Sequence, residues 1–315
     1  KKMLALTLAL VMALGLCACG GDTTDNGDAP AENPETNSPA ETVTLDLPPV
    51  EDLTGTDTSA IAGVEDGVLT VAMECTYAPY NWTQMDDSNG AVPISNVPGA
   101  YANGYDVMIA QRICETYGWE LEIVSSAWDS LCPAIQAGSM DANIAGQSMT
   151  ADRMKEVDMA GPYYYATIVV LTTKDSPYAN ATSIADLAGG TCTSQSGTIW
   201  YDSCLPQIPD ANILAATASA PDMLMSLNAD KCDLVVTDQP TGKGALVAYP
   251  DFKMLEFGGG DKDFQVSDED INIGISMKKG NTALKDAINE VLATMTADDY
   301  NTMMDEAISV QPLSE

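Results

Sequence analysis

From residue 68 to residue 308, the chain alternates strand-like runs with segments whose apolar residues recur at helical spacing. This alternation predicts an α/β fold with mixed, mainly parallel sheets. The roughly 250 residues that show it are enough for one large domain or for two smaller lobes. We expect strands at 68–73, 120–124, 142–145, 167–173, 191–194, 233–237 and 271–277. We expect helices at 105–117, 130–137, 183–187, 222–227, 281–296 and 298–308, and a further helix that begins at about residue 199.

The N-terminal region has a different composition. Two lysines precede an uncharged apolar run that ends at Cys19, and such a run is too short for a confident membrane span but typical of a signal peptide. Its last residues, Leu16 to Gly20, resemble the lipobox of bacterial lipoproteins, which implies a signal peptide at 1–18 and lipidation of Cys19. The alternative is an ordinary signal peptide with incidental cysteines. Residues 19–66, rich in Asp, Glu, Thr and Pro, predict a disordered acidic linker.

Charge and missing residue types narrow the function. The chain has 46 acidic and 13 basic residues, a net charge of −33, so we expect no nucleic-acid partner, because that binding depends on Lys and Arg. It has no histidine, which removes the usual general base and the commonest metal ligand. The acidic clusters at 86–90 and 261–263 lack the pattern of an EF-hand loop, so solvated turns explain them better than calcium sites.

Six cysteines follow the signal peptide, and no two of them are spaced C-x-x-C, which argues against a zinc site. Six cysteines in an exported protein allow fifteen full disulfide pairings. Several fall in apolar segments, where free Cys acts as a small hydrophobe, and we therefore expect mostly unpaired thiols and no metal or cofactor. The six are Cys75, Cys114, Cys132, Cys192, Cys204 and Cys232.

The stretch 145–153 is the strongest candidate for a binding site. It follows the expected strand at 142–145 and offers the Gly146 carbonyl, the Ser148 hydroxyl and the Arg153 guanidinium, while Thr150 can cap a short helix. The planar fork of an arginine suits a carboxylate. The alternative is that Arg153 only caps or salt-bridges a surface helix.

Several segments together resemble the extracellular solute-binding proteins that serve polar amino-acid ABC transporters. The resemblance covers about residues 66–310, and it is specific as a set although each motif alone is weak. Its segments are VLTVAMECTYAPYNW (68–82), NGYDVMIAQRIC (103–114), AWDSLCPAIQAGSMDANIAGQSMTADR (127–153), VDMAGPYYY (157–165), SIADLAGGTCTSQSGT (183–198), KCDLVVTDQP (231–240) and NIGISMKKGN (272–281).

The resemblance implies a two-lobed, periplasmic-binding-protein-like type 2 fold with a central ligand cleft and two hinge crossings. Lobe 1 would comprise 67–165 and 272–315, and lobe 2 would comprise 166–271, with the crossings near 163–167 and 269–273. Closure of the lobes around a ligand is a known switching mode.

The resemblance also implies roles for individual residues. Arg153 would grip the ligand α-carboxylate and Asp238 would pair with its α-ammonium, although an Asp before Pro240 can also simply cap a turn. Tyr77 and Trp128 would flank the ligand side chain, where the alternative is an ordinary core position. The remaining ligand-binding positions that the matched motifs imply are Gly146, Gln147, Ser148, Thr198 and Ile199.

Glu74 follows the first strand, where family members with basic or amide ligands often carry an acid. An unpaired carboxylate there would repel an acidic ligand side chain, which favours a polar, basic or amide amino acid. The segment 81–102 is longer than is usual in the family. It could narrow the ligand choice, act as a lid or be decoration.

These predictions describe the substrate-binding component of an ABC importer, not an enzyme, with no catalytic residues. It would be a monomer, lipid-anchored on the extracytoplasmic face of the bacterial membrane, and its partners would be a free amino acid and the permease subunits. One alternative is an enzyme on the same fold, such as a cyclic-acid dehydratase, with Glu74 as general acid or base. Another is the ligand-sensing domain of a receptor, which predicts a C-terminal transmembrane helix and a signalling module.

Overall fold

The computed structural model describes residues 45–312. The predicted signal peptide at 1–18, the lipidation site Cys19 and the first part of the predicted linker lie outside the described residues. Within 45–312, no helix combines the length and the apolar character that a membrane span requires.

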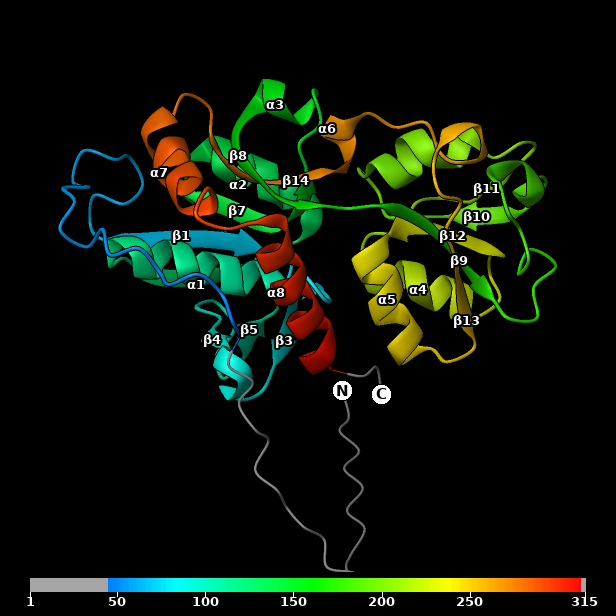
Figure 1. Ribbon diagram of the computed structural model, residues 1–315, viewed down its shortest axis with the longest axis horizontal. Coiled ribbons are helices and arrows are strands. Elements are labelled where there is room, and N and C mark those ends of the chain that lie inside the picture. The colour runs from blue at the N-terminus through cyan, green and yellow to red at the C-terminus, as the bar shows by residue number, and fades with distance from the viewer. Residues whose placement is uncertain (1–44, 313–315) are drawn as a thin grey trace, which may run out of the picture. The chain divides into compact units, whose positions relative to one another are not determined.

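Two five-stranded sheets form the framework of the described chain (Figure 1). In each sheet, two neighbouring pairs of strands are parallel and two are antiparallel. The first sheet has the order β6 (Glu120–Ser125), β1 (Val68–Met73), β7 (Ala142–Ser148), β14 (Asn272–Lys278) and β8 (Val157–Tyr165). The second has the order β11 (Asn212–Ile213), β10 (Thr191–Thr193), β12 (Leu234–Asp238), β9 (Ile168–Thr173) and β13 (Phe252–Leu255).

The prediction of mainly parallel sheets is therefore wrong. Parallel neighbours need a crossover connection of a dozen or more residues, usually a helix. Strand β14 instead enters the first sheet from the second one and runs antiparallel to both β7 and β8. Strand β9 enters the second sheet directly from β8 and runs antiparallel to β12 and β13. Sequence periodicity gives the length of a strand but not its direction.

The chain passes between the two sheets twice, and the two passages lie side by side. It leaves β8 for β9 and returns to β14, which pairs with β8 in Figure 1. The N–H of Ala166 donates to the carbonyl oxygen of Ile271 at 2.9 Å, so the two passages are hydrogen-bonded to each other. This is the two-lobed α/β fold with two crossings that the sequence predicted.

Helices cover both faces of the first sheet. Helix α1 is closed by Gly118 in the left-handed conformation (φ +72°), and Tyr117 at its end donates to the carbonyl oxygen of Ala287 in α7. Helix α2 packs through Ile135 on a separate cluster with Val157 and Met159 of β8, so it lies on the opposite face. The helices are α1 (Tyr105–Tyr117), α2 (Leu131–Ala137), α3 (Arg153–Glu156), α4 (Ala220–Asn228), α5 (Gln239–Ala248), α6 (Asp268–Ile271), α7 (Thr282–Leu292) and α8 (Ala297–Val310).

The segment 81–102 contributes to a third, antiparallel sheet that covers an edge of the first one. Ile94 forms a bridge with Ile123 of the edge strand β6, and the N–H of Ser95 donates to the Ile123 carbonyl oxygen at 2.8 Å. Covering an edge strand removes unpaired backbone groups that would otherwise invite association. The third sheet has the order β2 (Thr76–Tyr77), β3 (Asn81–Gln84), β5 (Tyr101–Asn103) and β4 (Val92–Pro93).

Residues 45–66 differ from the predicted disordered linker, because they pack on the first lobe. The N–H of Leu53 donates to the Thr116 carbonyl oxygen at 2.8 Å, and Arg112 Nη2 donates to the Pro48 carbonyl oxygen at 2.9 Å. Val64 is 1% exposed. The prediction of disorder rested on the average composition of the segment, which is polar, and it overlooked a few apolar residues that pack on the core. These are Leu45, Leu47, Leu53, Ile61 and Val64.

Candidate functional site

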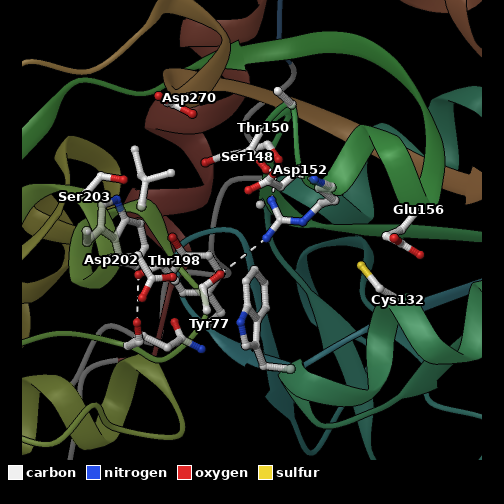
Figure 2. A pocket seen from close by; sticks show the side chains of 18 of the residues that line it. Tyr77, Cys132, Ser148, Thr150, Asp152, Glu156, Thr198, Asp202, Ser203 and Asp270 are labelled. Carbon is white, nitrogen blue, oxygen red and sulfur yellow. Dashed lines mark hydrogen bonds between the residues drawn. The ribbon is translucent and has the colours of Figure 1, made fainter.

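A cavity of about 580 Å³ is lined by residues from both lobes (Figure 2). Small-molecule sites in proteins commonly fall between about 300 and 1,000 Å³, so its size suits an amino acid. It brings together seven of the ten predicted ligand-binding residues. These are Tyr77, Trp128, Gly146, Ser148, Arg153, Thr198 and Ile199.

Arg153 begins the one-turn helix α3 and reaches across this cavity. Its backbone N–H donates to Thr150 Oγ1 at 3.2 Å, although the N-cap residue of α3 is Asp152 and not the predicted Thr150. Its guanidinium donates to the carbonyl oxygen of Ser148 and, at 3.5 Å, to that of Gly197 in the other lobe. Cζ lies 5.7 Å from the centre of the Trp128 ring. A guanidinium has five N–H donors, so others remain for a carboxylate.

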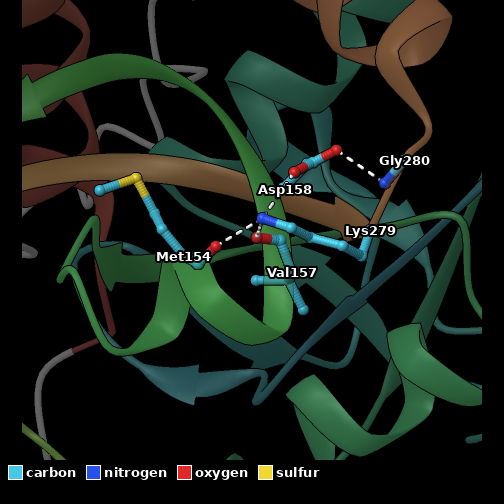
Figure 3. A network of polar contacts seen from close by, with 5 residues as sticks. All are labelled: Met154, Val157, Asp158, Lys279 and Gly280. Atoms are coloured by element: carbon cyan, nitrogen blue, oxygen red, sulfur yellow. Dashed lines mark hydrogen bonds and ion pairs between the residues drawn. The ribbon is translucent and has the colours of Figure 1, made fainter.

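The far end of α3 is held by Lys279, which follows β14 (Figure 3). Its ammonium donates to the carbonyl oxygen of Met154 at 2.6 Å and to that of Val157 at 3.4 Å. It also forms an ion pair with Asp158 at 3.0 Å. A cation near a helix C-terminus satisfies carbonyl groups that have no partner in the helix. Both ends of the turn that presents Arg153 are therefore fixed.

Strand β7 divides its predicted binding residues between two faces. Gly146 and Ser148 line the cavity, whereas Gln147 is 1% exposed and accepts a hydrogen bond from Ser276 Oγ at 3.0 Å on the other side. Successive side chains of a strand point to opposite faces. Gln147 is therefore not among the residues that line the cavity, and β7 continues to Ser148 instead of ending at residue 145.

Gly146 is a position where only glycine fits. Its φ is +60°, a conformation that residues with a Cβ rarely adopt. A Cβ placed there would lie 2.7 Å from Cε1 of Tyr77 and 3.3 Å from the Tyr80 ring. The close approach brings the β7 backbone directly against the aromatic wall of the cavity.

Asp238 is fully buried and does not line the cavity. Its Oδ2 accepts a hydrogen bond from the Tyr77 hydroxyl at 2.8 Å, and its Oδ1 accepts one from the N–H of Thr241 at 2.8 Å. The second bond caps α5, which is the alternative weighed for this residue. Burial raises the pKa of Asp238. Tyr77, which does line the cavity, stands between the carboxylate and the space where a ligand would lie.

Glu74 is also buried behind the lining residues, and it is not unpaired as the sequence argument assumed. Gln195 Nε2 lies 3.4 Å from each of its carboxylate oxygens. Burial raises its pKa to about 7. Gln195 lines the cavity from the other lobe. Sequence reasoning missed Gln195, although a polar residue just after the expected strand at 191–194 and just before Gly197 was a usable signal.

The cavity wall carries much more negative than positive charge. Arg153 is the one cationic residue among those that line it. Four carboxylates also line it, and all four are labelled in Figure 2. The four are Asp152, Glu156, Asp202 and Asp270. No sequence pattern indicated Asp202 or Asp270, because the π-helix Trp200–Cys204 and α6 approach the cavity only through the fold.

The long segment 81–102 contributes no residue to the lining of this cavity. Instead, Asn96 exchanges two hydrogen bonds of 2.9 Å with the backbone of Ser125, and Ser125 Oγ donates to the Glu74 carbonyl oxygen at 3.2 Å. The segment therefore braces the strand end beside Glu74. The described residues contain no group of three potential metal ligands, and the six cysteines named above are free thiols.

Comparison with known proteins identifies the chain's relatives. The family described as bacterial extracellular solute-binding proteins, family 3, matches residues 69–308. ABC transporter arginine-binding protein 1 of Escherichia coli (strain K12) is 27% identical over 195 residues, covering 62% of this chain and 76% of that protein. The probable histidine-binding protein of Neisseria gonorrhoeae is 25% identical over 303 residues, covering 93% of this chain and 89% of that protein.

Among solved structures, the substrate-binding protein of an amino acid ABC transporter matches with a TM-score of 0.62 and 27% identity, covering 76% of this chain and 98% of that one. The matched segment 69–308 contains all residues that line the cavity. The chain belongs to family 3 of the bacterial extracellular solute-binding proteins.

Proposed function

We propose that this chain is the substrate-binding component of an ABC importer and that it captures a basic amino acid, with arginine as the first candidate. The observation that carries the proposal is the charge of the cavity: Arg153 is the one cation among the lining residues, and four carboxylates line it, of which only Asp152 is ion-paired, with Lys155. A zwitterion needs one cation for its carboxylate, and the surplus of negative charge then favours a cationic side chain over an anionic one. Relatives named for arginine and histidine binding support the same class.

In this proposal, Arg153 holds the ligand carboxylate bidentately, helped by Ser148 and by the backbone N–H groups at 198 and 199. Asp238 takes the α-ammonium once the Tyr77 hydroxyl gives up its bond to that carboxylate. Tyr77 and Trp128 flank the side chain. Binding closes the lobes 67–165 with 272–315 and 166–271 around the ligand, and the closed form is the one presented to the permease.

The lipid anchor is a separate proposal that depends on the N-terminal sequence. We infer a signal peptide at 1–18, lipidation of Cys19 and a tether from 19 to 44, which would hold a monomer at the extracytoplasmic face of the membrane. Cys19→Ala should release the protein from the membrane fraction and abolish labelling by a radioactive fatty acid, while Cys17→Ala should change neither. Equal labelling of the wild type and Cys19→Ala would refute the assignment.

One observation favours a second candidate, an enzyme on the same fold. Glu74, with its pKa raised to about 7 by burial, is suited to proton transfer at neutral pH. However, Gln195 holds both of its oxygens and lies between it and the cavity. Incubation with cyclic hydroxy acids, followed by chromatography, tests this alternative. Product formation that Glu74→Gln abolishes would establish it.

The direct test of the proposed function is calorimetric titration of the purified protein with each of the twenty amino acids. Arg153→Ala and Asp238→Ala should each weaken binding about hundredfold or more, because each leaves a charge of the ligand unpaired in the cavity. Lys231→Ala removes an exposed cation outside the cavity lining and should leave the affinity unchanged. Binding of glutamate in preference to arginine would overturn the ligand class, and no binding of any amino acid would overturn the function.

A further inference from the structure

The carboxyl group of Asp106 has no part in the site described above. It lies in the first turn of α1 and is fully buried. Its Oδ1 accepts a hydrogen bond from the Tyr163 hydroxyl at 2.6 Å, and its Oδ2 accepts one from Asn81 Nδ2 at 2.8 Å. A buried carboxylate is costly unless it is well satisfied, and here both oxygens have a donor.

Each of these two partners holds a backbone segment at the cavity. The Tyr163 hydroxyl accepts the N–H of Gly146 at 3.1 Å. Asn81 Oδ1 accepts the N–H of Cys75 at 2.7 Å. Gly146 lines the cavity, and Cys75 lies between Glu74 and the strand that carries Tyr77.

Both of these backbone positions have a positive φ, and the one at Cys75 needs outside support because cysteine carries a Cβ. Gly146 has φ +60°, and Cys75, which has a side chain, has φ +57°. Left-handed conformations in residues other than glycine persist when surrounding contacts hold them. Asp106 thus reaches one such position through Tyr163 and the other through Asn81.

The network leaves no freedom in the direction of its hydrogen bonds. The Tyr163 hydroxyl has one proton and gives it to Asp106, because it accepts from Gly146. Asn81 must turn its amide nitrogen toward Asp106, because its oxygen accepts from Cys75. Two donors therefore meet at position 106, and an ionised carboxylate is the side chain that only accepts.

We propose that Asp106 is a positioning residue of the ligand site, which sets the backbone at Gly146 and at Cys75 through Tyr163 and Asn81. The part of this proposal that concerns ligand affinity rests on the proposed function. The part that concerns the two backbone segments does not.

The test compares three variants of the full-length protein by hydrogen exchange of individual backbone amides and by calorimetric titration with L-arginine. Asp106→Asn introduces an amide nitrogen that must face either Asn81 Nδ2 or the Tyr163 hydroxyl, so in both orientations one donor loses its acceptor. The double variant Asp106→Asn with Asn81→Asp reverses the pair: the amide introduced at 106 donates to the carboxylate introduced at 81, which still accepts from Cys75. Tyr163→Phe removes only the connection to Gly146.

We expect Asp106→Asn to speed exchange at Gly146 and Cys75 at least tenfold and to weaken L-arginine binding about tenfold. The double variant should return both measurements to within about threefold of the wild type. Tyr163→Phe should speed exchange at Gly146 and not at Cys75. Asp141→Asn, which alters a half-buried carboxylate that accepts from Thr70 in the same sheet, should leave both amides and the affinity unchanged.

Exchange at Gly146 and Cys75 that stays at the wild-type rate in Asp106→Asn would overturn the proposal, as would a double variant no better than the single one. If Asp106→Asn does not fold, the double variant and Tyr163→Phe decide the question in the same way. If the wild type fails to bind L-arginine, the proposed ligand is wrong, while the exchange measurements still test the role of Asp106.

Discussion

Replacing Glu74 with glutamine removes a buried charge while keeping the shape of the side chain. Burial raises the pKa of Glu74 from an ordinary 4.5 to about 7. The introduced amide oxygen can still accept from Gln195, whose nitrogen now lies 3.4 Å from the carboxylate. The substitution therefore isolates the energetic effect of the charge.

The size and sign of this effect follow from the two pKa values. Because the folded chain binds the proton more tightly than the unfolded one, the stabilisation by protonated Glu74 is complete below pH 4.5 and is lost as the pH rises through about 7. A tenfold change in a protonation equilibrium corresponds to about 1.4 kcal/mol, so the ionised group costs roughly 3 kcal/mol above pH 7. Glu74→Gln should equal the wild type near pH 4.5 and exceed its stability by roughly 3 kcal/mol, or about 6–12 °C in melting temperature, above pH 7.

Thermal and urea unfolding of both proteins between pH 4.5 and pH 8.5 measures this difference. Glu115→Gln removes a charge from an exposed position of α1 and should show no comparable pH dependence. A stability difference that is the same at pH 4.5 and at pH 8.5, or a variant that is less stable than the wild type at pH 8.5, would refute the reasoning about Glu74.

Two further predictions concern the backbone around the cavity. Gly146→Ala combines a positive φ with a contact of 2.7 Å to Tyr77, so it should lose about 2–4 kcal/mol of stability in thermal unfolding. Gly67→Ala, with φ +81° and open space around it, should lose only about 1 kcal/mol, and an equal loss in both would argue against the contact with Tyr77. Lys279→Met removes the donor at the end of α3 and should weaken L-arginine binding severalfold in calorimetric titration, with under about 1 kcal/mol of lost stability because the ion pair is half-exposed. Lys278→Met is its control, and an equal change in affinity in both variants would show that only the net charge matters.

The parts of the fold that the sequence predicted best are those with strong periodicity and clear ends. The strand at 68–73 and the helix at 105–117 have the predicted bounds. Gly104 and Gly118 flank that helix, and the second glycine ends it in the left-handed conformation. Local chemistry alone determines such elements, so no knowledge of the tertiary structure was needed.

The errors occurred where tertiary pairing decides the structure. Strand β7 continues through Gly146 to Ser148 because β14 pairs with it, matching Gly274 with Gln147 and Ile273 with Ser148. A glycine followed by hydroxyl residues reads as a turn when that partner strand is unknown. The same is true of residues 45–66, whose few apolar side chains have a core to pack on only after the first lobe has formed.

In the candidate site, too, local sequence predicted some features and tertiary structure decided the others. Motif order indicated which residues would approach the cavity, and Arg153, Ser148, Tyr77 and Trp128 do so. The sequence could not show how far each side chain lies behind the cavity wall. Asp238 lies behind Tyr77 because the tyrosine hydroxyl of one lobe reaches the carboxylate of the other.

Polar contacts at Tyr77, Arg153 and Gln195 join the lobes at the cavity, and a basic amino acid offers a replacement partner at each of these three places. Tyr77 donates to Asp238 at 2.8 Å, Arg153 donates to the Gly197 carbonyl oxygen at 3.5 Å, and Gln195 donates to Glu74 at 3.4 Å. The α-ammonium, the α-carboxylate and a cationic side chain would take the places of these partners. Binding free energy is then the difference between the new contacts and the old ones, so the two long contacts are given up at little cost and the short one is the main cost. A neutral amino acid has no cationic side chain to replace the contact between Gln195 and Glu74. We therefore expect discrimination between arginine and a neutral amino acid of similar size to arise at the lining carboxylates and at the contact between Glu74 and Gln195, and not at Arg153, which every amino acid would engage alike.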